Sequence, residues 1–212
     1  MLDRAVRRRI DPWLDALAER LTDVGVTANT LTVISFLIGV VAAGSIGAQN
    51  YIVGLGLLLV SRLGDGLDGP VARAHARRRD GATHGTDLGG YLDIVLDFGF
   101  YALVPLGFVL ANPAANAVAG AVLLAAFYFN GASFLAFAAL AEKRAARGRP
   151  GVETGPKAFL YTVGLMEGTE TIVFFVLLCL LPGWFASLAY AFAALTLATT
   201  LARIGLAVRT FR

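Results

Sequence analysis

The amino-acid sequence predicts an all-α membrane protein: six transmembrane helices, preceded by an amphipathic helix at the membrane surface. The 212 residues are 57% hydrophobic and only 16% charged, and the mean hydropathy is +0.70. A soluble domain carries about 25% charged residues, so this chain has too little polar surface to face water on every side. The apolar residues gather in long segments and the basic residues gather between them. This pattern excludes a soluble nucleic-acid-binding domain, although the net charge is +3.

The six predicted spans are apolar segments of the length that crosses a bilayer as a helix, about 20 residues. In chain order they are residues 31–48, 51 to about 74, 88–110, 115–141, 158–181 and 184 to about 208. The only cysteine, Cys179, lies in the fifth segment, so an intramolecular disulfide is impossible.

The connections between these segments alternate in charge. Those at 49–50, 111–114 and 182–183 contain no Lys or Arg. The N-terminal segment, the 74–87 loop, the 142–157 loop and the C-terminus hold nearly all the basic residues. Because basic connections stay on the cytoplasmic side, we expect a multi-pass protein of the cytoplasmic (inner) membrane with both termini inside.

Residues 1–27 are predicted to form a separate juxtamembrane helix, and residues 28–212 a single transmembrane catalytic domain. The run has no signal-peptide pattern. Apolar residues recur in it at helical spacing, at Trp13, Leu14, Leu17, Leu21 and Val24. This favours an amphipathic helix lying at the cytoplasmic interface. A helix packed on the bundle is an equally good interpretation.

Four aspartates stand in the predicted second and third spans, where a charge is costly and therefore indicates function. Asp65 and Asp68 are i, i+3, and Asp93 and Asp97 are i, i+4, so each pair shares a helix face. Both pairs fall in the cytoplasmic half of their spans. Two divalent cations would balance the four carboxylates, and oxygen ligands favour Mg²⁺ or Mn²⁺. A structural Asp–Arg network is the alternative, but few arginines lie nearby to compensate the acids.

A metal pair bound by carboxylates suits phosphoryl chemistry, because the ions neutralise phosphate oxygens. Arg73 can bind a phosphate with two hydrogen bonds. Gly66 and Gly69 leave room for a substrate to approach the backbone. The run Arg77 to Arg79 favours a solvated or lipid-headgroup contact, and His84 is interpreted as a loop residue.

The residues Asp65-Gly-Leu-Asp68-Gly69-Pro-Val-Ala72-Arg73 and Gly89-Gly-Tyr-Leu-Asp93-Ile-Val-Leu-Asp97 resemble the signature of the CDP-alcohol phosphotransferase family, D-x2-D-G-x2-A-R followed by G-x3-D-x3-D. All eight signature positions are present. The run from Thr27 to Thr32 is similar to the family's T-P-N-x-L-T, with Ala28 where proline is usual. The 15 residues between Arg73 and Gly89 make a longer spacer than the family's usual one.

The resemblance implies a role for each signature position. Asp65, Asp68, Asp93 and Asp97 would bind the metal ions, and Asp97 would also be the general base. Asp65, Gly69, Ala72 and Arg73 would bind the CDP moiety. The resemblance further implies a homodimer.

The expected reaction transfers a phosphatidyl group from CDP-diacylglycerol to the hydroxyl of a small polar alcohol, with release of CMP. Transfer from CDP-choline or CDP-ethanolamine to diacylglycerol is an alternative within the family. A cation-coupled transporter is an alternative of another class, since it would also carry intramembrane acids. The complete signature argues against a third reading, a membrane scaffold without activity.

The acceptor alcohol is open in the sequence. A phosphorylated acceptor requires basic residues, and choline, ethanolamine or serine requires an acidic or aromatic pocket. The candidate acceptor-binding residues are Glu167, Glu170, Arg203, Lys143, Arg144 and Lys157. The two glutamates can equally serve helix packing, and the basic residues can equally be ordinary cytoplasmic charges.

Overall fold

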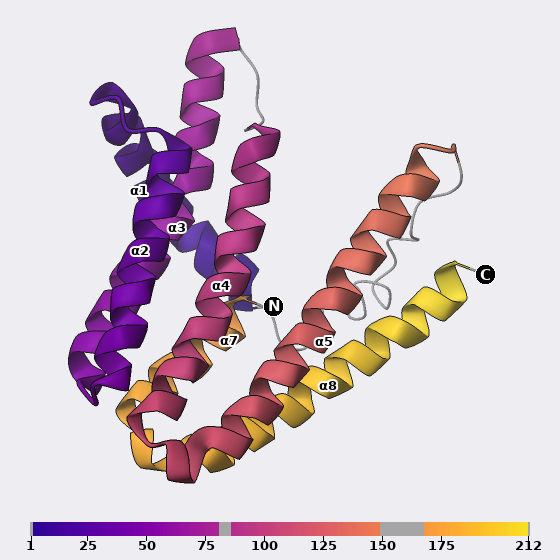
Figure 1. The fold of residues 1–212 in the computed structure, drawn as a ribbon. Coiled ribbons are helices and arrows are strands. Elements are labelled where there is room, and N and C mark those ends of the chain that lie inside the picture. Colours follow the sequence, from indigo (N-terminus) through magenta and orange to yellow (C-terminus); the bar gives the residue numbers. More distant parts are fainter. Residues whose placement is uncertain (1, 81–85, 149–167, 212) are drawn as a thin grey trace. The chain divides into compact units, whose positions relative to one another are not determined.

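The structure, a computed structural model, describes residues 2–80, 86–148 and 168–211. Within these ranges every regular element is a helix, which confirms the all-α prediction (Figure 1). The chain forms two compact units, Met1–Ala111 and Asn112–Arg212. Each unit has its own packing and is described by itself.

Unit 1 contains α1 (Leu2–Asp23), α2 (Ala28–Gly47), α3 (Tyr51–Asp80) and α4 (Asp87–Ala111). α2 packs against both α3 and α4. Small residues permit this close approach, as is usual between membrane helices. A Cβ at Gly39 of α2 would lie 2.6 Å from the ring of Phe100, and one at Gly107 of α4 would lie 2.6 Å from the Ala43 carbonyl oxygen. These contacts fix the position of α4 against α2.

The start of α2 is set by a side-chain cap. The Thr27 hydroxyl accepts a hydrogen bond from the Thr30 backbone N–H at 3.3 Å, which satisfies one of the free donors of the first turn. The turn between α2 and α3 passes through Gln49, whose φ is 63°. The Gln49 side chain donates to the Ala111 carbonyl oxygen at 2.8 Å, which ties this turn to the end of α4.

The helix α1 packs on α3, with Ala18 and Thr22 buried. The packing interpretation of the N-terminal helix is therefore correct for one of its faces. Trp13 is 80% exposed, and Leu17 and Val24 are also exposed, so the membrane-surface interpretation remains a prediction for the other face.

Unit 2 contains α5 (Pro113–Ala145), α7 (Gly168–Leu180), a 3-10 turn η1 (Pro182–Trp184) and α8 (Phe185–Thr210). α5 packs along α8. Asn112 caps α5 by accepting from the Ala115 backbone N–H at 3.3 Å. Aromatic side chains join the helices of this unit, and the rings of Phe174 and Phe192 stack with centroids 4.0 Å apart.

Four of the described helices, α2, α4, α5 and α8 with its preceding turn, are long and apolar enough to cross a membrane. α3 is as long, but carries Arg62, Asp65 and Asp68 among its apolar residues. α7 is apolar but has only 13 described residues; residues 158–167 of the predicted fifth span lie outside the described ranges. The count of six spans therefore remains a prediction.

Candidate active site

Three of the signature aspartates lie close enough together to hold one cation. Carboxylate oxygens of Asp65 on α3 and of Asp93 and Asp97 on α4 all lie within 4.8 Å of one another. The spacing within α4 turns both of its aspartates to one face, and the packing against α2 brings that face to Asp65. The structure thus brings Asp65 together with two carboxylates that lie 28 and 32 residues later in the sequence.

The fourth aspartate, Asp68, is held from α2. The Thr32 hydroxyl donates a hydrogen bond to Asp68 Oδ2 at 2.7 Å. Thr32 is buried and Asp68 is half-buried, so water has limited access to this bond. Thr32 is also the last threonine of the Thr27–Thr32 run. Through this contact, the beginning of α2 orients a carboxylate of α3.

An arginine lies among these aspartate carboxylates. Arg62 Nη1 lies 2.6 Å from Asp97 Oδ1 and 3.4 Å from Asp65 Oδ2. The Arg62 side chain is only 7% exposed, and its guanidinium carbon lies 3.7 Å from the centre of the Phe100 ring. The cluster of Arg62, Asp65, Asp68, Asp93 and Asp97 is called the acid cluster below.

The acid cluster fits a hard divalent cation by its chemistry. Its described donors are carboxylate oxygens, the ligands that Mg²⁺ and Mn²⁺ prefer. Opposite ligands of an octahedral Mg²⁺ lie about 4.2 Å apart, close to the spread of the three clustered oxygens. The negative charge of the aspartates exceeds the positive charge of the single arginine, so the acid cluster still attracts cations.

The predicted CDP-binding residues follow the cluster along α3. A Cβ at Gly69 would lie 3.4 Å from Arg73 Nη1, so the guanidinium lies over the glycine backbone. Arg73 Nη2 lies 3.8 Å from Asp15 Oδ1 of α1, and both side chains are about half exposed. Ala72 is half-buried beside them. Arg73 is thus accessible and only weakly held.

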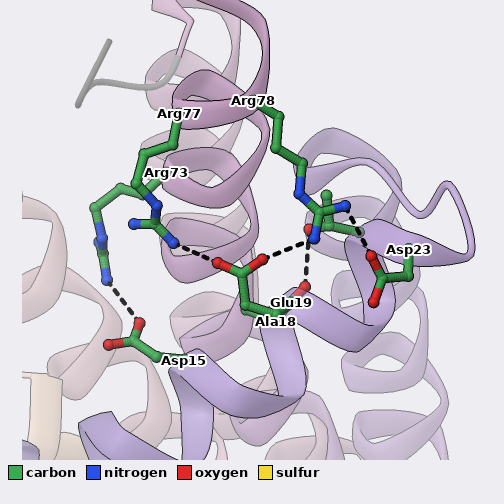
Figure 2. A network of polar contacts seen from close by, with 8 residues as sticks. Asp15, Ala18, Glu19, Asp23, Arg73, Arg77 and Arg78 are labelled. Atoms are coloured by element: carbon green, nitrogen blue, oxygen red, sulfur yellow. Dashed lines mark hydrogen bonds and ion pairs between the residues drawn. The ribbon is translucent and has the colours of Figure 1, made fainter. Parts of the chain in front are cut away.

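Beyond Arg73, α3 continues for about two more helical turns, to Asp80. The long spacer therefore begins as an extension of α3, and Arg77 and Arg78 on it face α1 (Figure 2). Glu19 accepts from Arg77 Nη2 at 2.7 Å and from Arg78 Nη2 at 2.8 Å, and Arg78 Nη1 lies 2.9 Å from Asp23. The side chains of Arg77 and Arg78 are about half exposed, so the solvated or lipid-headgroup contact stays a prediction for them, and the acids of α1 are an additional partner. His84 lies outside the described residues.

These contacts change the acidity of their members. Hydrogen bonds from Arg77 and Arg78 hold the pKa of the Glu19 carboxyl below its usual range. Hydrogen bonds to Glu19 and Asp23 raise the pKa of Arg78. The set of Asp15, Glu19, Asp23, Arg73, Arg77 and Arg78 is called the surface network below.

The candidate acceptor-binding residues that are described lie in unit 2. Arg203 of α8 is buried, and its Nη1 donates to the Asn130 side-chain oxygen at 2.9 Å and to the Ser133 hydroxyl at 2.7 Å. Among the described residues no carboxylate pairs with it. Arg144 donates to the Thr210 carbonyl oxygen, and Lys143 is exposed.

The candidate acids of the fifth span are only partly described. Glu170 stands in the first turn of α7 and is half-buried. Glu167 and Lys157 lie outside the described residues.

Sequence reasoning missed Arg62 as a site residue. It lies one helical turn before Asp65, inside an apolar segment, so it met the same test of a charge within a span that singled out the aspartates. Asn130 and Ser133 were also passed over, since neutral polar residues in an apolar helix carry no comparable signal.

Apolar helices and a carboxylate cluster suited to a hard cation define an all-helical membrane protein with a metal-type site. The chain belongs to the CDP-alcohol phosphatidyltransferase family, whose model matches residues 25–202. The resemblance seen in the signature is therefore confirmed.

The chain is also similar to two proteins of other organisms. Inner membrane protein YnjF of Escherichia coli (strain K12) is 50% identical over 204 residues, which cover 96% of this chain and 94% of that protein. Archaetidylinositol phosphate synthase of Pyrococcus horikoshii is 33% identical over 92 residues, 43% of this chain and 45% of that protein.

Among solved structures, the chain is similar to the phosphatidylinositol phosphate synthase of Mycobacterium tuberculosis. The structure of that enzyme with CDP-DAG bound gives a TM-score of 0.63 at 19% identity, covering 91% of this chain and 92% of that one. Its complex with manganese and citrate gives a TM-score of 0.64 at 18% identity, covering 91% and 88%. At this identity the likeness shows a shared fold.

Proposed function

We propose that the protein transfers a phosphatidyl group from CDP-diacylglycerol to the hydroxyl of a small polar alcohol and releases CMP. The observation that carries this proposal is the acid cluster, in which carboxylate oxygens of Asp65 on α3 and of Asp93 and Asp97 on α4 meet within 4.8 Å. The family assignment supports the CDP-alcohol substrate, and the mycobacterial enzyme of the same fold has CDP-DAG bound.

In this reaction the acceptor oxygen attacks the phosphorus that bears the diacylglycerol group. The bond from that phosphorus to the CMP oxygen breaks, and a phosphodiester lipid forms. The hydroxyl proton must leave as the new bond forms, and Asp97 is the proposed base. Arg62 engages Asp97 Oδ1 and thereby fixes the orientation of the carboxylate, which a general base requires.

Asp65, Asp68, Asp93 and Asp97 are the proposed ligands of two divalent cations, Mg²⁺ or Mn²⁺. When bound, such cations would neutralise the charge on the phosphate oxygens and on the leaving group. The manganese in the mycobacterial neighbour supports a divalent site in this fold.

Gly69, Ala72 and Arg73, together with Asp65, are the proposed CDP-binding residues. Gly69 leaves the backbone open beneath the Arg73 guanidinium, so an anion there can reach both. The weak contact of Arg73 with Asp15 leaves its hydrogen-bond donors available to a phosphate.

The acceptor class is proposed from unit 2 alone. Among the described residues, the partners of the buried Arg203 guanidinium are neutral oxygens, and burying a cation without an anion is costly. This favours an acceptor with an anionic group such as a phosphate, with Arg203, Lys143, Arg144 and Lys157 as the candidate residues. An acceptor such as choline would instead use Glu167 and Glu170.

The remaining expectations are also proposals. We propose cytoplasmic termini, a cytoplasmic active site, a juxtamembrane segment at 1–27 before a catalytic domain at 28–212, and a homodimer. The basic connections support the orientation, and the inner-membrane description of the Escherichia coli relative supports the compartment.

The test is CMP release by the purified protein with CDP-diacylglycerol, Mn²⁺ or Mg²⁺ and a panel of alcohols and alcohol phosphates. Asp97→Asn should lower the rate by about 10²–10⁴-fold, the usual contribution of a general base. Asp87→Asn, on the exposed first turn of the same helix, is the matched control and should retain activity.

Unchanged activity in Asp97→Asn, or activity that survives chelation, would overturn the mechanism. CMP release only from CDP-choline or CDP-ethanolamine with diacylglycerol would replace the proposed substrates with the alternative of the same family. Cation uptake into liposomes without CMP release would indicate the transporter.

A further inference from the structure

Arg62 joins carboxylates of two different helices. It lies on α3 one turn before Asp65, and a single nitrogen, Nη1, contacts Asp97 Oδ1 at 2.6 Å and Asp65 Oδ2 at 3.4 Å. Asp97 belongs to α4. The guanidinium therefore stands between the two carboxylates that the metal-type site draws from opposite helices.

The surroundings hold the Arg62 guanidinium in this place. The Phe100 ring, which is fully buried, lies 3.7 Å from it. Its Nη2 donates to the Ser61 hydroxyl at 3.3 Å, and Ser61 in turn donates to the Ser35 carbonyl oxygen at 2.7 Å. A long side chain near the end of a span usually extends its charge toward water. Arg62 instead keeps its charge among buried groups of α2, α3 and α4.

The position of the Arg62 guanidinium affects the electrostatics of the aspartate carboxylates. Carboxylates that share a low-dielectric site repel one another strongly. Arg62 supplies one positive charge to the cluster permanently, and it contacts two of the three aspartates that could share a cation. It therefore opposes the repulsion whether or not a divalent ion is bound, and it also repels any cation that binds beside it.

We propose that Arg62 is a built-in cation of the acid cluster and a positioning residue: it pairs Asp65 with Asp97 before metal binds, and it weakens the affinity for divalent ions. The inference rests on the metal-binding part of the proposed function but not on the transferase reaction. It makes two linked predictions, that the metal-free fold depends on Arg62 and that metal can replace it.

The test compares the metal-free and Mn²⁺-loaded stability of the purified protein in detergent, by thermal unfolding and by calorimetric titration with Mn²⁺. Arg62→Met removes the charge and keeps much of the length. Arg77→Met is the matched control, because Arg77 is on the same helix and its ion pair is half exposed.

In chelator, Arg62→Met should unfold at a clearly lower temperature than Arg77→Met. Mn²⁺ should raise the midpoint of Arg62→Met more than that of the wild type, and should bind to it about tenfold more tightly or better, because a like charge beside the ion is gone. Arg62→Lys keeps the charge and should leave Mn²⁺ affinity close to that of the wild type.

Equal metal-free midpoints in the two methionine variants, or Mn²⁺ affinity that is unchanged or weaker in Arg62→Met, would overturn the proposal. If Arg62→Met folds only with Mn²⁺, metal replaces the arginine as proposed. If it folds in neither condition, the Mn²⁺ affinity is measured on Arg62→Gln instead, which is also expected to bind Mn²⁺ more tightly than the wild type. CMP release is not a readout here, so loss of the transferase proposal would leave this result standing.

Discussion

Two groups of arginine–carboxylate contacts lie on the same helix, α3, and differ in their access to water. In the acid cluster, the Arg62 side chain is 7% exposed and lies against an aromatic ring. In the surface network, the side chains of Arg73, Arg77 and Arg78 are 45–49% exposed and meet acids of α1 (Figure 2). The ion-pair chemistry is the same in both places.

Because they differ in solvent access, the two groups of ion pairs have different structural roles. A buried pair is costly to assemble and more costly to break, because removing one partner leaves a charge that water cannot reach. An exposed pair adds little stability and is screened by salt. The acid cluster therefore fixes a geometry, while the surface network attaches α1 to α3 in a contact that solution conditions can weaken.

Gly39→Ala tests the buried side of this comparison most strongly. The new Cβ would lie 2.6 Å from Cδ2 of Phe100 and 3.1 Å from the Ser61 hydroxyl, two groups that hold the Arg62 guanidinium. Overpacking of this kind costs about 1–3 kcal/mol. We expect a lower unfolding midpoint and a lower rate of CMP release, measured in detergent. Gly44→Ala, on the same helix with no atom within 4 Å of its Cβ, should change neither, and an equal loss in both variants would contradict the packing argument.

Thr32→Val should have the next largest effect. It removes the hydrogen bond to Asp68 Oδ2 and preserves the shape of the buried side chain. Groups that orient a metal ligand typically affect metal affinity by 10-fold or more, so we expect Mn²⁺ affinity to fall about tenfold in calorimetric titration. Thr32→Ser retains the hydroxyl and should bind Mn²⁺ nearly as the wild type does. Weakened binding in both variants would assign the effect to packing.

The acid pairs could be predicted from the sequence because helical periodicity alone is sufficient. It places Asp65 and Asp68 on one face of their helix, and Asp93 and Asp97 on one face of theirs. The position of the Arg62 guanidinium could not be predicted. Whether such a side chain turns to a carboxylate or extends to water depends on where α4 lies, and Asp97 is 35 residues away in the sequence. Long-range packing decides this, and the local pattern does not contain it.

The surface network shows the same limit in exposed residues. The accessibility of Arg77 and Arg78 can be predicted from their sequence, but their partner Glu19 lies 58 and 59 residues earlier in the chain. The extension of α3 past Arg73 could not be predicted either, because a run of arginines is compatible with a loop and with an exposed helix. In unit 2, the polar partners of Arg203 depend in the same way on the packing of α5 against α8.

Glu19→Gln should produce the smallest change, and its dependence on salt and pH distinguishes the surface network from the acid cluster. The variant loses the charge that Arg77 and Arg78 share. We expect a small decrease in the unfolding midpoint at low salt, which should vanish at about 0.5 M salt because screening is then strong. Glu142→Gln, at an exposed glutamate for which the structure describes no ion pair, is the control and should show no such salt dependence.

The pH dependence follows from the lowered pKa of Glu19. The folded protein holds this carboxylate in its charged form more strongly than the unfolded chain does, so its stabilisation is complete above the ordinary glutamate pKa of about 4.3. That stabilisation is lost as the pH falls through the lower folded value. The wild type should therefore be more stable than Glu19→Gln at neutral pH, and the two midpoints should converge below pH 4.3 or so. A difference that persists in acid and in high salt would show that Glu19 acts through packing, and the contrast between the two regions of α3 would then not be one of solvent access.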